Sequence, residues 1–302
     1  MSAIIMDGKA LGLKIRESVK IKAAALKEKG ITPCLAVILV GEDPASLSYV
    51  KSKEKALAEA GMESRDIRLP ETTSEAELLS MIAGLNMDDK VHGILVQSPV
   101  PKHIDEEKVN EAVAPQKDVD CFHPDSVGNM VLDRPGFLPC TPHGVLALLR
   151  EYNVPVSGAH AVVVGRSNIV GKPLANLLIR REYNATVTLC HTGTKDIARY
   201  TLQADILIAA AGKPCLIKPE MVKEGACVID VGINRVSCPV DSGDPSSLKG
   251  YRICGDVDPA AAEKASFFTP VPGGVGPMTI AMLLQNVAEA ASIVCAGNFV
   301  VK

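Results

Sequence analysis

Apolar runs typical of buried strands alternate with helix signals along the first part of the chain. CLAVILVG (34–41) and VHGILVQ (91–97) are nearly continuous apolar runs, typical of strands buried on both faces of a parallel sheet. Helix signals separate them: Asp7 can cap a helix that reaches Lys29, and Ser74 with Glu77 forms a capping box. A short strand is expected around residues 65–69. This alternation predicts an open parallel sheet with helices on both sides.

The pattern changes between residues 115 and 142, where proline, glycine and aspartate are frequent. We expect loops there, followed by a helix from about Thr141 that serves as a hinge. A polar stretch at 235–250 predicts a surface excursion, and the last helix should run from about Pro277 to Ile293. Further apolar runs predict a second series of strands at AHAVVVG (159–165), ATVTLC (185–190), ADILIAAA (204–211), ACVIDVG (226–232) and RICGDVD (252–258).

Composition narrows the class of protein. The 302 residues suffice for two domains, and 47% hydrophobic with 22% charged residues is typical of a soluble globular protein. A net charge of −3 and 3% aromatic residues give no basis for binding nucleic acid or an acidic membrane surface. We expect no membrane span, because no apolar run reaches the required length of about 18 residues. The start lacks the features of a signal peptide, so the expected location is the cytoplasm.

Cysteine and histidine usage predicts neither disulfides nor a metal site. The nine cysteines are odd in number and scattered, and no Cys-x-x-Cys occurs. Most lie in apolar surroundings, where a free thiol acts as a small core residue. No His/Cys cluster has the spacing of metal ligands.

Tyr49 and Lys53 are the first candidates for chemistry. They lie four residues apart in a predicted helix, which places both side chains on one face. A phenol beside an amine can move protons if burial or nearby cations let the amine lose its charge at neutral pH. Taken alone, such a pair more often belongs to a solvated basic helix face.

The segment VVVGRSNIVGKPLANLL predicts a nucleotide site. It reads as a strand, a turn bounded by Gly165 and Gly171, and a helix, which together offer backbone N–H groups to a phosphate. The glycines do not follow Gly-x-Gly-x-x-Gly, so an ordinary strand-to-helix turn is the alternative. The next strand ends in His191 and Thr192 and lacks the acid that usually selects NAD. Because Arg166 could contact a 2′-phosphate, NADP is favoured over NAD.

The chain resembles a known family, the bifunctional methylenetetrahydrofolate dehydrogenases/methenyltetrahydrofolate cyclohydrolases. The segments that carry the resemblance occur in the family's order: VGEDPASLSYVKSKEKA, GILVQSPVP, KDVDCFHP, PCTPHG, VVVGRSNIVGKPLA, CHTGT, DVGIN, GDVD and TPVPGGVGPMT. The resemblance implies an α/β fold with two domains flanking a cleft, and usually a homodimer. Residues 1–140 plus 277–302 would form the folate-binding catalytic domain, and residues 141–276 a Rossmann-type NADP-binding domain with a parallel sheet.

The resemblance also implies a reaction, part of one-carbon metabolism and purine biosynthesis. The family oxidises methylenetetrahydrofolate with NADP and hydrolyses the methenyl product to formyltetrahydrofolate. The residues that match the family's functional positions fall into three groups. They are Lys53, Tyr49 and Gln97 for catalysis, Tyr49, Asp120, Pro272, Gly273 and Gly274 for substrate, and Gly165, Arg166, Ser167, Thr192 and Ile233 for cofactor.

Two positions depart from the family pattern. Cys121 stands where glycine is usual after KDVD, and Gly193 stands where a cation is usual after CH[ST], which weakens the preference for NADP. Cys121 and His123 could suggest a nucleophile and base. We reject that role, because no acid or amide is placed to orient the histidine and the reaction needs no covalent intermediate.

Three other classes of protein share part of this pattern. A short-chain dehydrogenase also uses Tyr-x-x-x-Lys, but its glycine-rich turn precedes that pair, whereas Tyr49 precedes Gly165 here. A monofunctional NAD(P)-dependent methylenetetrahydrofolate dehydrogenase would not need Lys53, so the presence of Lys53 argues against this alternative. A binding protein without turnover would be expected to lack Lys53 or Asp120, and both are present.

Overall fold

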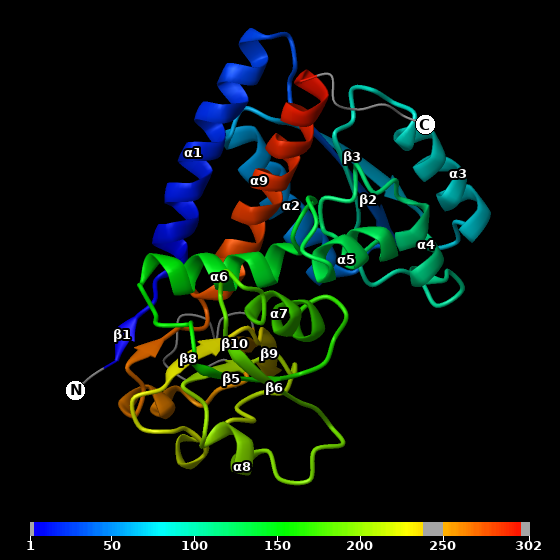
Figure 1. Ribbon diagram of the computed structural model, residues 1–302. Coiled ribbons are helices and arrows are strands. Elements are labelled where there is room, and N and C mark those ends of the chain that lie inside the picture. Colours follow the sequence, from blue (N-terminus) through cyan, green and yellow to red (C-terminus); the bar gives the residue numbers. More distant parts are fainter. Residues whose placement is uncertain (1–2, 238–249, 297–302) are drawn as a thin grey trace. The chain divides into compact units, whose positions relative to one another are not determined.

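The computed structural model describes residues 3–237 and 250–296 (Figure 1). Contacts between residues divide the chain into two compact units. The six-strand unit contains the N-terminal residues up to Gly12 and Thr141–Thr279, and the three-strand unit contains Leu13–Cys140 and the residues from Ile280 onward. This division differs from the predicted domains at residues 1–12, because Ile4–Ile5 pairs with Phe267–Phe268 in the larger sheet.

Helices and strands alternate along most of the chain. The helices are α1 (Gly8–Glu28), α2 (Pro44–Glu59), α3 (Glu75–Asn86), α4 (Glu106–Ala112), α5 (Pro124–Val131), α6 (Cys140–Glu151), α7 (Gly171–Leu178), α8 (Ala198–Thr201) and α9 (Val275–Cys295), with short 3-10 helices at Pro219–Met221 and Pro259–Glu263. The strands are β1 (Ile4–Ile5), β2 (Cys34–Val40), β3 (Glu63–Leu69), β4 (Gly93–Val96), β5 (His160–Val164), β6 (Thr186–Cys190), β7 (Ile206–Ala209), β8 (Cys227–Asp230), β9 (Asn234–Ser237), β10 (Tyr251–Cys254) and β11 (Phe267–Phe268).

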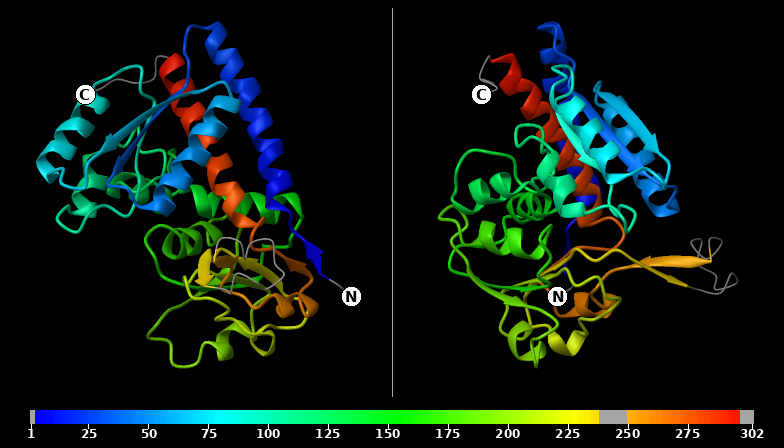
Figure 2. Two further views of the ribbon diagram at one scale, coloured as in Figure 1. Left: turned by 180° about the vertical axis from the view of Figure 1, so that it is seen from behind. Right: turned by 90° about the vertical axis from the view of Figure 1, so that its right-hand side faces the viewer.

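The three-strand unit is built on a parallel sheet in the order β3-β2-β4. Every residue of β2 is buried, as its unbroken apolar sequence predicts. Leu78 and Ile82 of α3 pack against Ile38 of β2 in one core cluster, so α3 covers one face of the sheet. α1 and α9 lie side by side in all views, joined by an ion pair between Lys22 and Glu289 (Figures 1 and 2).

The six-strand unit contains a fully parallel sheet in the order β1-β11-β8-β7-β5-β6. The chain continues from β5 to β6 on one side, and then returns to place β7 on the other side of β5. Such a reversal of strand order is the point where open α/β sheets bind ligands, outside the carboxyl ends of the strands. The predicted α/β class and the parallel sheet of the second half are confirmed.

Several predicted elements are confirmed and others are corrected. The predicted capping box of Ser74 and Glu77 is present. The expectation of loops across 115–142 is wrong for Pro124–Val131, which forms α5. The predicted excursion at 235–250 begins instead with β9, which pairs antiparallel with β10, so the strand predicted at 252–258 belongs to this hairpin (Figure 2). Residues 238–249 lie outside the described residues.

α9 departs from the expectation that no stretch of the chain could span a bilayer. By length and composition, it is the one helix among the described residues that could do so. However, 56% of its apolar window is buried inside the protein. Asn286, 5% exposed, donates from its side-chain amide to the carbonyl oxygens of Val119 (2.8 Å) and Leu138 (3.0 Å). Burial with a satisfied polar side chain is typical of a helix in a protein core.

Candidate functional site

Lys53 and its neighbours form a first candidate site, in the three-strand unit. The Asp43 carboxylate accepts a hydrogen bond from the Ser46 backbone N–H and caps α2, which carries Tyr49 and Lys53 one turn apart. The Lys53 side chain is only 4% exposed, and its Nζ lies 4.8 Å from the centroid of the Tyr49 ring. The predicted one-sided pair is therefore a buried pair, and not a solvated basic face.

Gln97 reaches the same amine from the end of β4. Its backbone N–H donates to Ile38 O (2.8 Å), extending the pairing of β4 with β2 by one residue. Its Oε1 accepts a hydrogen bond from Lys53 Nζ at 3.1 Å, while its Nε2 donates to Ser98 O at 2.8 Å. Because both polar atoms of the amide are engaged, Gln97 presents its oxygen to the lysine in one fixed orientation.

Burial shifts the pKa values of Lys53 and Tyr49, the two side chains on α2, in opposite directions. It lowers the pKa of the Lys53 amine from its usual 10.5, opposed by the nearby Asp120 carboxylate, which favours the charged form. Burial raises the pKa of the Tyr49 phenol to about 12, and Asp120 adds to this effect. The phenol therefore stays protonated near neutral pH, and Lys53 is the member of the pair that can offer a lone pair.

Asp120 lies on a loop that several buried groups hold in place. The Asp118 carboxylate, 4% exposed, accepts hydrogen bonds from the backbone N–H groups of Phe122 (3.0 Å) and His123 (2.8 Å). Burial raises the pKa of this carboxyl. The buried Cys140 thiol donates to Val119 O at 3.4 Å and also hydrogen-bonds with Asp120. Asp120 is thereby held close enough to Tyr49 and Lys53 to favour the protonated form of both side chains.

The two residues that could suggest a nucleophile have structural roles. Cys121 is 1% exposed and has φ 60°, a left-handed conformation that glycine adopts without strain, which explains why glycine suits this position. His123 caps α5: its Nδ1 accepts a hydrogen bond from the Asp125 backbone N–H at 3.0 Å.

A second candidate site lies at the carboxyl edge of the six-strand sheet. Gly165, directly after β5, has φ 131°, and a Cβ built on it would meet Ala210 O, directly after β7, at 2.0 Å. A Cβ on Gly171 would meet Gly165 O at 2.0 Å. These two glycines therefore let the backbone approach closely at the switch point of the sheet, forming a cradle that a bound pyrophosphate could occupy.

The remaining predicted cofactor residues surround this cradle. Ser167 Oγ accepts hydrogen bonds from the backbone N–H groups of Val170 (3.2 Å) and Gly171 (3.3 Å) and so shapes the turn into α7. Arg166, Thr192 and Ile233 follow β5, β6 and β8 and are all exposed at the same edge of the sheet. The residues present thus fit a dinucleotide, and Arg166 is an exposed cation next to Gly165.

Two buried carboxylates brace these loops, and sequence reasoning missed their roles. Asp256, fully buried, accepts hydrogen bonds from the backbone N–H groups of Ala211 (2.6 Å) and Gly212 (2.8 Å) and from Asn234 Nδ2 (2.8 Å). Asp230 accepts from the N–H groups of Gly232, Asp256 and Val257 at 2.9–3.0 Å. Burial raises the pKa of Asp230 to about 6. The motifs DVGIN and GDVD marked both residues, but their partnership is not visible in sequence.

The predicted substrate residues Pro272, Gly273 and Gly274 belong to the six-strand unit, unlike Tyr49, Lys53, Gln97 and Asp120. Their loop packs against the start of α1. Gly273 O accepts a hydrogen bond from the Lys9 backbone N–H at 3.0 Å, and a Cβ on Gly8 would meet Gly274 O at 1.8 Å.

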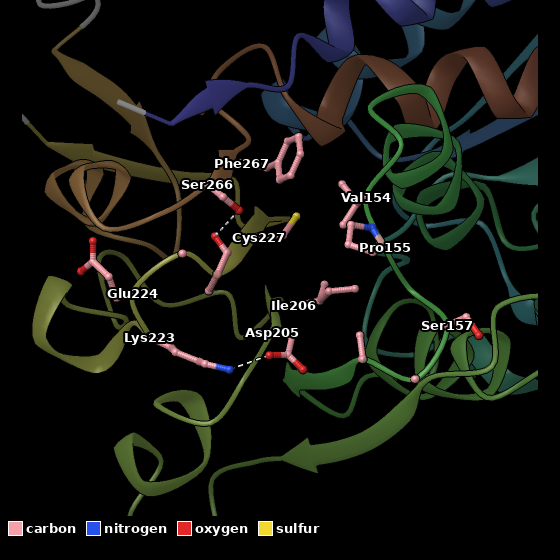
Figure 3. Close-up of a pocket in the computed structure, with 14 residues that line it drawn as sticks. Val154, Pro155, Ser157, Asp205, Ile206, Lys223, Glu224, Cys227, Ser266 and Phe267 are labelled. Atoms are coloured by element: carbon pink, nitrogen blue, oxygen red, sulfur yellow. Dashed lines mark hydrogen bonds and ion pairs between the residues drawn. The ribbon is translucent and has the colours of Figure 1, made fainter. Parts of the chain in front are cut away.

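A cavity of about 430 Å³ opens at the opposite, amino edge of the six-strand sheet (Figure 3). Ile206, Cys227 and Phe267, at the starts of β7, β8 and β11, line it. Lys223 and Asp205 form an ion pair there, with Nζ and Oδ1 2.6 Å apart. Because ligands of parallel α/β sheets bind at the carboxyl edge, this cavity is separate from the candidate site.

No group of three or more His, Cys, Asp or Glu side chains in the described part of the chain is arranged to hold a metal ion. The chemistry that the described residues offer is a buried amine with an orienting amide, a carboxylate and a phenol in one unit, and a backbone cradle in the other.

Comparisons with known proteins match both halves of the chain. Residues 6–120 match the family model for the catalytic domain of tetrahydrofolate dehydrogenase/cyclohydrolase, and residues 139–295 match the model for its NAD(P)-binding domain. The chain is 56% identical to the bifunctional protein FolD of Exiguobacterium sibiricum over 96% of its own length and 99% of that protein.

Two solved structures are similar over nearly the whole chain. The bifunctional FolD enzyme of Campylobacter jejuni is 51% identical with a TM-score of 0.90, covering 96% of this chain and 99% of that one. The Trypanosoma brucei methylenetetrahydrofolate dehydrogenase-cyclohydrolase, in complex with NADP and an inhibitor, is 38% identical with a TM-score of 0.90, covering 97% and 98%.

Proposed function

The chain belongs to the tetrahydrofolate dehydrogenase/cyclohydrolase family, and from this premise we propose how its residues carry out the two reactions. The enzyme oxidises methylenetetrahydrofolate to methenyltetrahydrofolate with NADP, and then hydrolyses the methenyl product to formyltetrahydrofolate. We assign the hydrolysis to the side chains around Lys53 and the binding of the dinucleotide to the carboxyl edge of the six-strand sheet.

The buried Lys53 amine is the observation that supports hydrolysis. The methenyl carbon already carries cationic character, so water needs only to be placed beside it and relieved of a proton. A neutral lysine can accept that proton, and burial favours the neutral form of this amine. The Gln97 Oε1 atom accepts a hydrogen bond from Nζ at 3.1 Å, and so fixes the direction in which the nitrogen lone pair points.

Tyr49 and Asp120 supply the groups that orient the folate. The Tyr49 phenol keeps its proton near neutral pH, because its pKa is about 12, and it can therefore donate a hydrogen bond to water or folate. The Asp120 carboxylate can accept a pair of N–H hydrogen bonds from the edge of the pterin ring and hold the ring in one orientation. We also place the Pro272–Gly274 loop against the folate.

The cradle around Gly165 is the feature that supports a dinucleotide. NADP, when bound, supplies the hydride acceptor for the oxidation. Gly165 and Ser167 would hold the pyrophosphate, Thr192 and Ile233 would line the remaining length of the dinucleotide, and Arg166 would contact the 2′-phosphate. His191, Thr192 and Gly193 offer no carboxylate to a ribose 2′-hydroxyl, which supports NADP over NAD.

The alternative is a monofunctional, NAD(P)-dependent dehydrogenase. The buried contact between Lys53 and Gln97 favours the bifunctional enzyme, because hydride transfer asks for alignment of the reactants and not for a base. We further propose that the enzyme acts in the cytoplasm as a homodimer, which rests on its similarity to the family.

A two-wavelength assay tests this proposal. Purified protein with methylenetetrahydrofolate and either NADP or NAD should give reduced cofactor and a transient methenyl absorbance. With Lys53→Met, the reduced cofactor should still form while methenyl absorbance accumulates and decays only at the uncatalysed rate. If Lys53→Met consumed methenyltetrahydrofolate at the parent rate, the assignment of Lys53 would be wrong.

A further inference from the structure

Two cysteines of the six-strand unit, Cys215 and Cys254, are neighbours in space although far apart in sequence. The Cys215 backbone N–H donates to Gly255 O at 3.1 Å, and two residues further along Ile217 and Val257 form a parallel bridge. Burial and the neighbouring Cys215 side chain raise the pKa of the Cys254 thiol. The backbone segments that carry the two thiols are thus already aligned.

This spacing suits a disulfide. Neighbouring paired strands lie about 5 Å apart, and most disulfides join Cα atoms between about 4.4 and 6.8 Å apart. Both side chains are partly exposed, whereas Cys121 and Cys140, which also interact, are 1% and 3% exposed. A reagent in solution can therefore reach Cys215 and Cys254 far more readily than the buried pair.

A cavity of about 510 Å³ leads to Cys254. It is lined mainly by apolar residues such as Val257, Phe268 and Pro270, with Arg252 as a cation and Asp230 as a carboxylate. Burial raises the pKa of the Cys254 thiol, while Arg252 acts in the opposite direction by favouring the thiolate. A small anionic molecule would thus find space beside this sulfur and a complementary charge in Arg252, because the Asp230 carboxylate is already hydrogen-bonded by three backbone N–H groups.

We propose that Cys215 and Cys254 form a redox-active dithiol that reacts with small anionic disulfides. The thiolate of one cysteine attacks the disulfide RSSR, forming a mixed disulfide and releasing one RS⁻, which takes up a proton. The second cysteine then attacks the protein sulfur of that mixed disulfide and releases the other RSH. The two protein thiols are oxidised to one intramolecular disulfide, and the reagent is reduced to two thiols.

The position of this dithiol gives it a direct structural consequence. Cys215 follows the loop of Ala211 and Gly212, and Cys254 lies two residues before Asp256, whose carboxylate holds that loop. A disulfide here joins the same two segments covalently. Because it cross-links positions that are distant in the unfolded chain, it should also raise the melting temperature. None of these steps depends on the proposed enzymatic function.

Peptide mapping of the oxidised protein tests the proposal. Reduced full-length protein is incubated with glutathione disulfide, its remaining thiols are alkylated, and its peptides are analysed without reduction. We expect a peptide that links Cys215 to Cys254, a higher melting temperature, and reversal of both by dithiothreitol. Cys215→Ser and Cys254→Ser should each stop at the glutathione adduct of the remaining cysteine.

Cys295→Ser is the matched control, because Cys295 is also partly exposed and lies outside this pair. It should form the same linked peptide as the parent. The proposal would be overturned if the parent kept both thiols free under conditions that modify Cys295. It would also be overturned if Cys254 were linked to Cys238, which lies outside the described residues, instead of Cys215.

Discussion

Replacing Gln97 by glutamate should stop hydrolysis by fixing the charge on Lys53. The change is nearly isosteric, and it places a carboxylate where the amide oxygen now lies 3.1 Å from Nζ. Two unit charges about 4 Å apart attract each other by about 4 kcal/mol at an effective dielectric constant of about 20, so at 3.1 Å the attraction is at least that large. That energy corresponds to a rise of about three pH units in the pKa of Lys53.

The consequence is a loss of the neutral amine. At each pH below the parent's midpoint, the neutral fraction of Lys53 should fall about 1000-fold, and hydrolysis should fall with it. The assay follows the decay of methenyltetrahydrofolate absorbance against pH, after subtraction of the uncatalysed rate. The rising limb of the parent's profile should move upward by about three pH units in Gln97→Glu.

Gln97→Met is the matched control, because it removes the same hydrogen bonds without adding a charge. It should lose orientation of the amine and therefore some activity, but its rising limb should not move upward. If Gln97→Glu hydrolysed the substrate within a few-fold of the parent rate, with an unchanged pH profile, Lys53 could not act as a neutral base.

Three further predictions concern the six-strand unit. Arg166→Ala should weaken NADP binding about 10-fold more than NAD binding, measured by titration; equal losses would show that Arg166 does not contact the 2′-phosphate. Gly165→Ala should weaken the binding of both dinucleotides at least about 10-fold, because φ 131° strains alanine and its Cβ would meet Ala210 O at 2.0 Å. Hydrolysis at Lys53 should persist. Unchanged dinucleotide binding would refute this prediction. Between pH 4 and 6 the folded protein keeps a proton on Asp230 that the unfolded chain releases, because burial raises the pKa to about 6 from 3.8. The contribution of Asp230 to the free energy of unfolding should therefore fall by about 3 kcal/mol as pH rises through this window. Denaturant titrations of Asp230→Asn should lack this pH dependence; an unchanged pH dependence would refute the prediction.

The sequence predicted the buried parallel strands because their signal is local. CLAVILV and AVVV are continuous apolar runs, and each forms a strand buried almost completely. β1 and β11 could not be predicted in this way. Each has two residues, and Ile4 and Ile5 are about half exposed, so only their pairing with distant partners defines them.

The helix α5 was missed because its composition resembles that of a loop. PDSVGNMV contains proline, glycine, aspartate and asparagine, which are common in turns. Proline at the first position of a helix is also a start signal, and His123 supplies the cap. His123 is the missed cue for this helix, because its residue type also suggests a catalytic base.

The candidate site was predictable to different degrees. The four-residue spacing of Tyr49 and Lys53 placed both on one helical face without further information. Gln97 and Asp120 come from other segments, and only the resemblance to a known family linked them to Lys53. The partnership of Asp230 with Asp256 depends on long-range pairing, for which one sequence carries no signal.

The state of the Lys53 amine is the central claim, and a direct titration tests it. Protein labelled with ¹⁵N and ¹³C at lysine is followed by NMR across pH, and Lys53→Met identifies the signal that belongs to Lys53. The Lys53 resonance should titrate below 10.5, the ordinary lysine pKa, because the side chain is buried. A midpoint at or above 10.5 would contradict the account, because the amine would then be charged whenever the enzyme works.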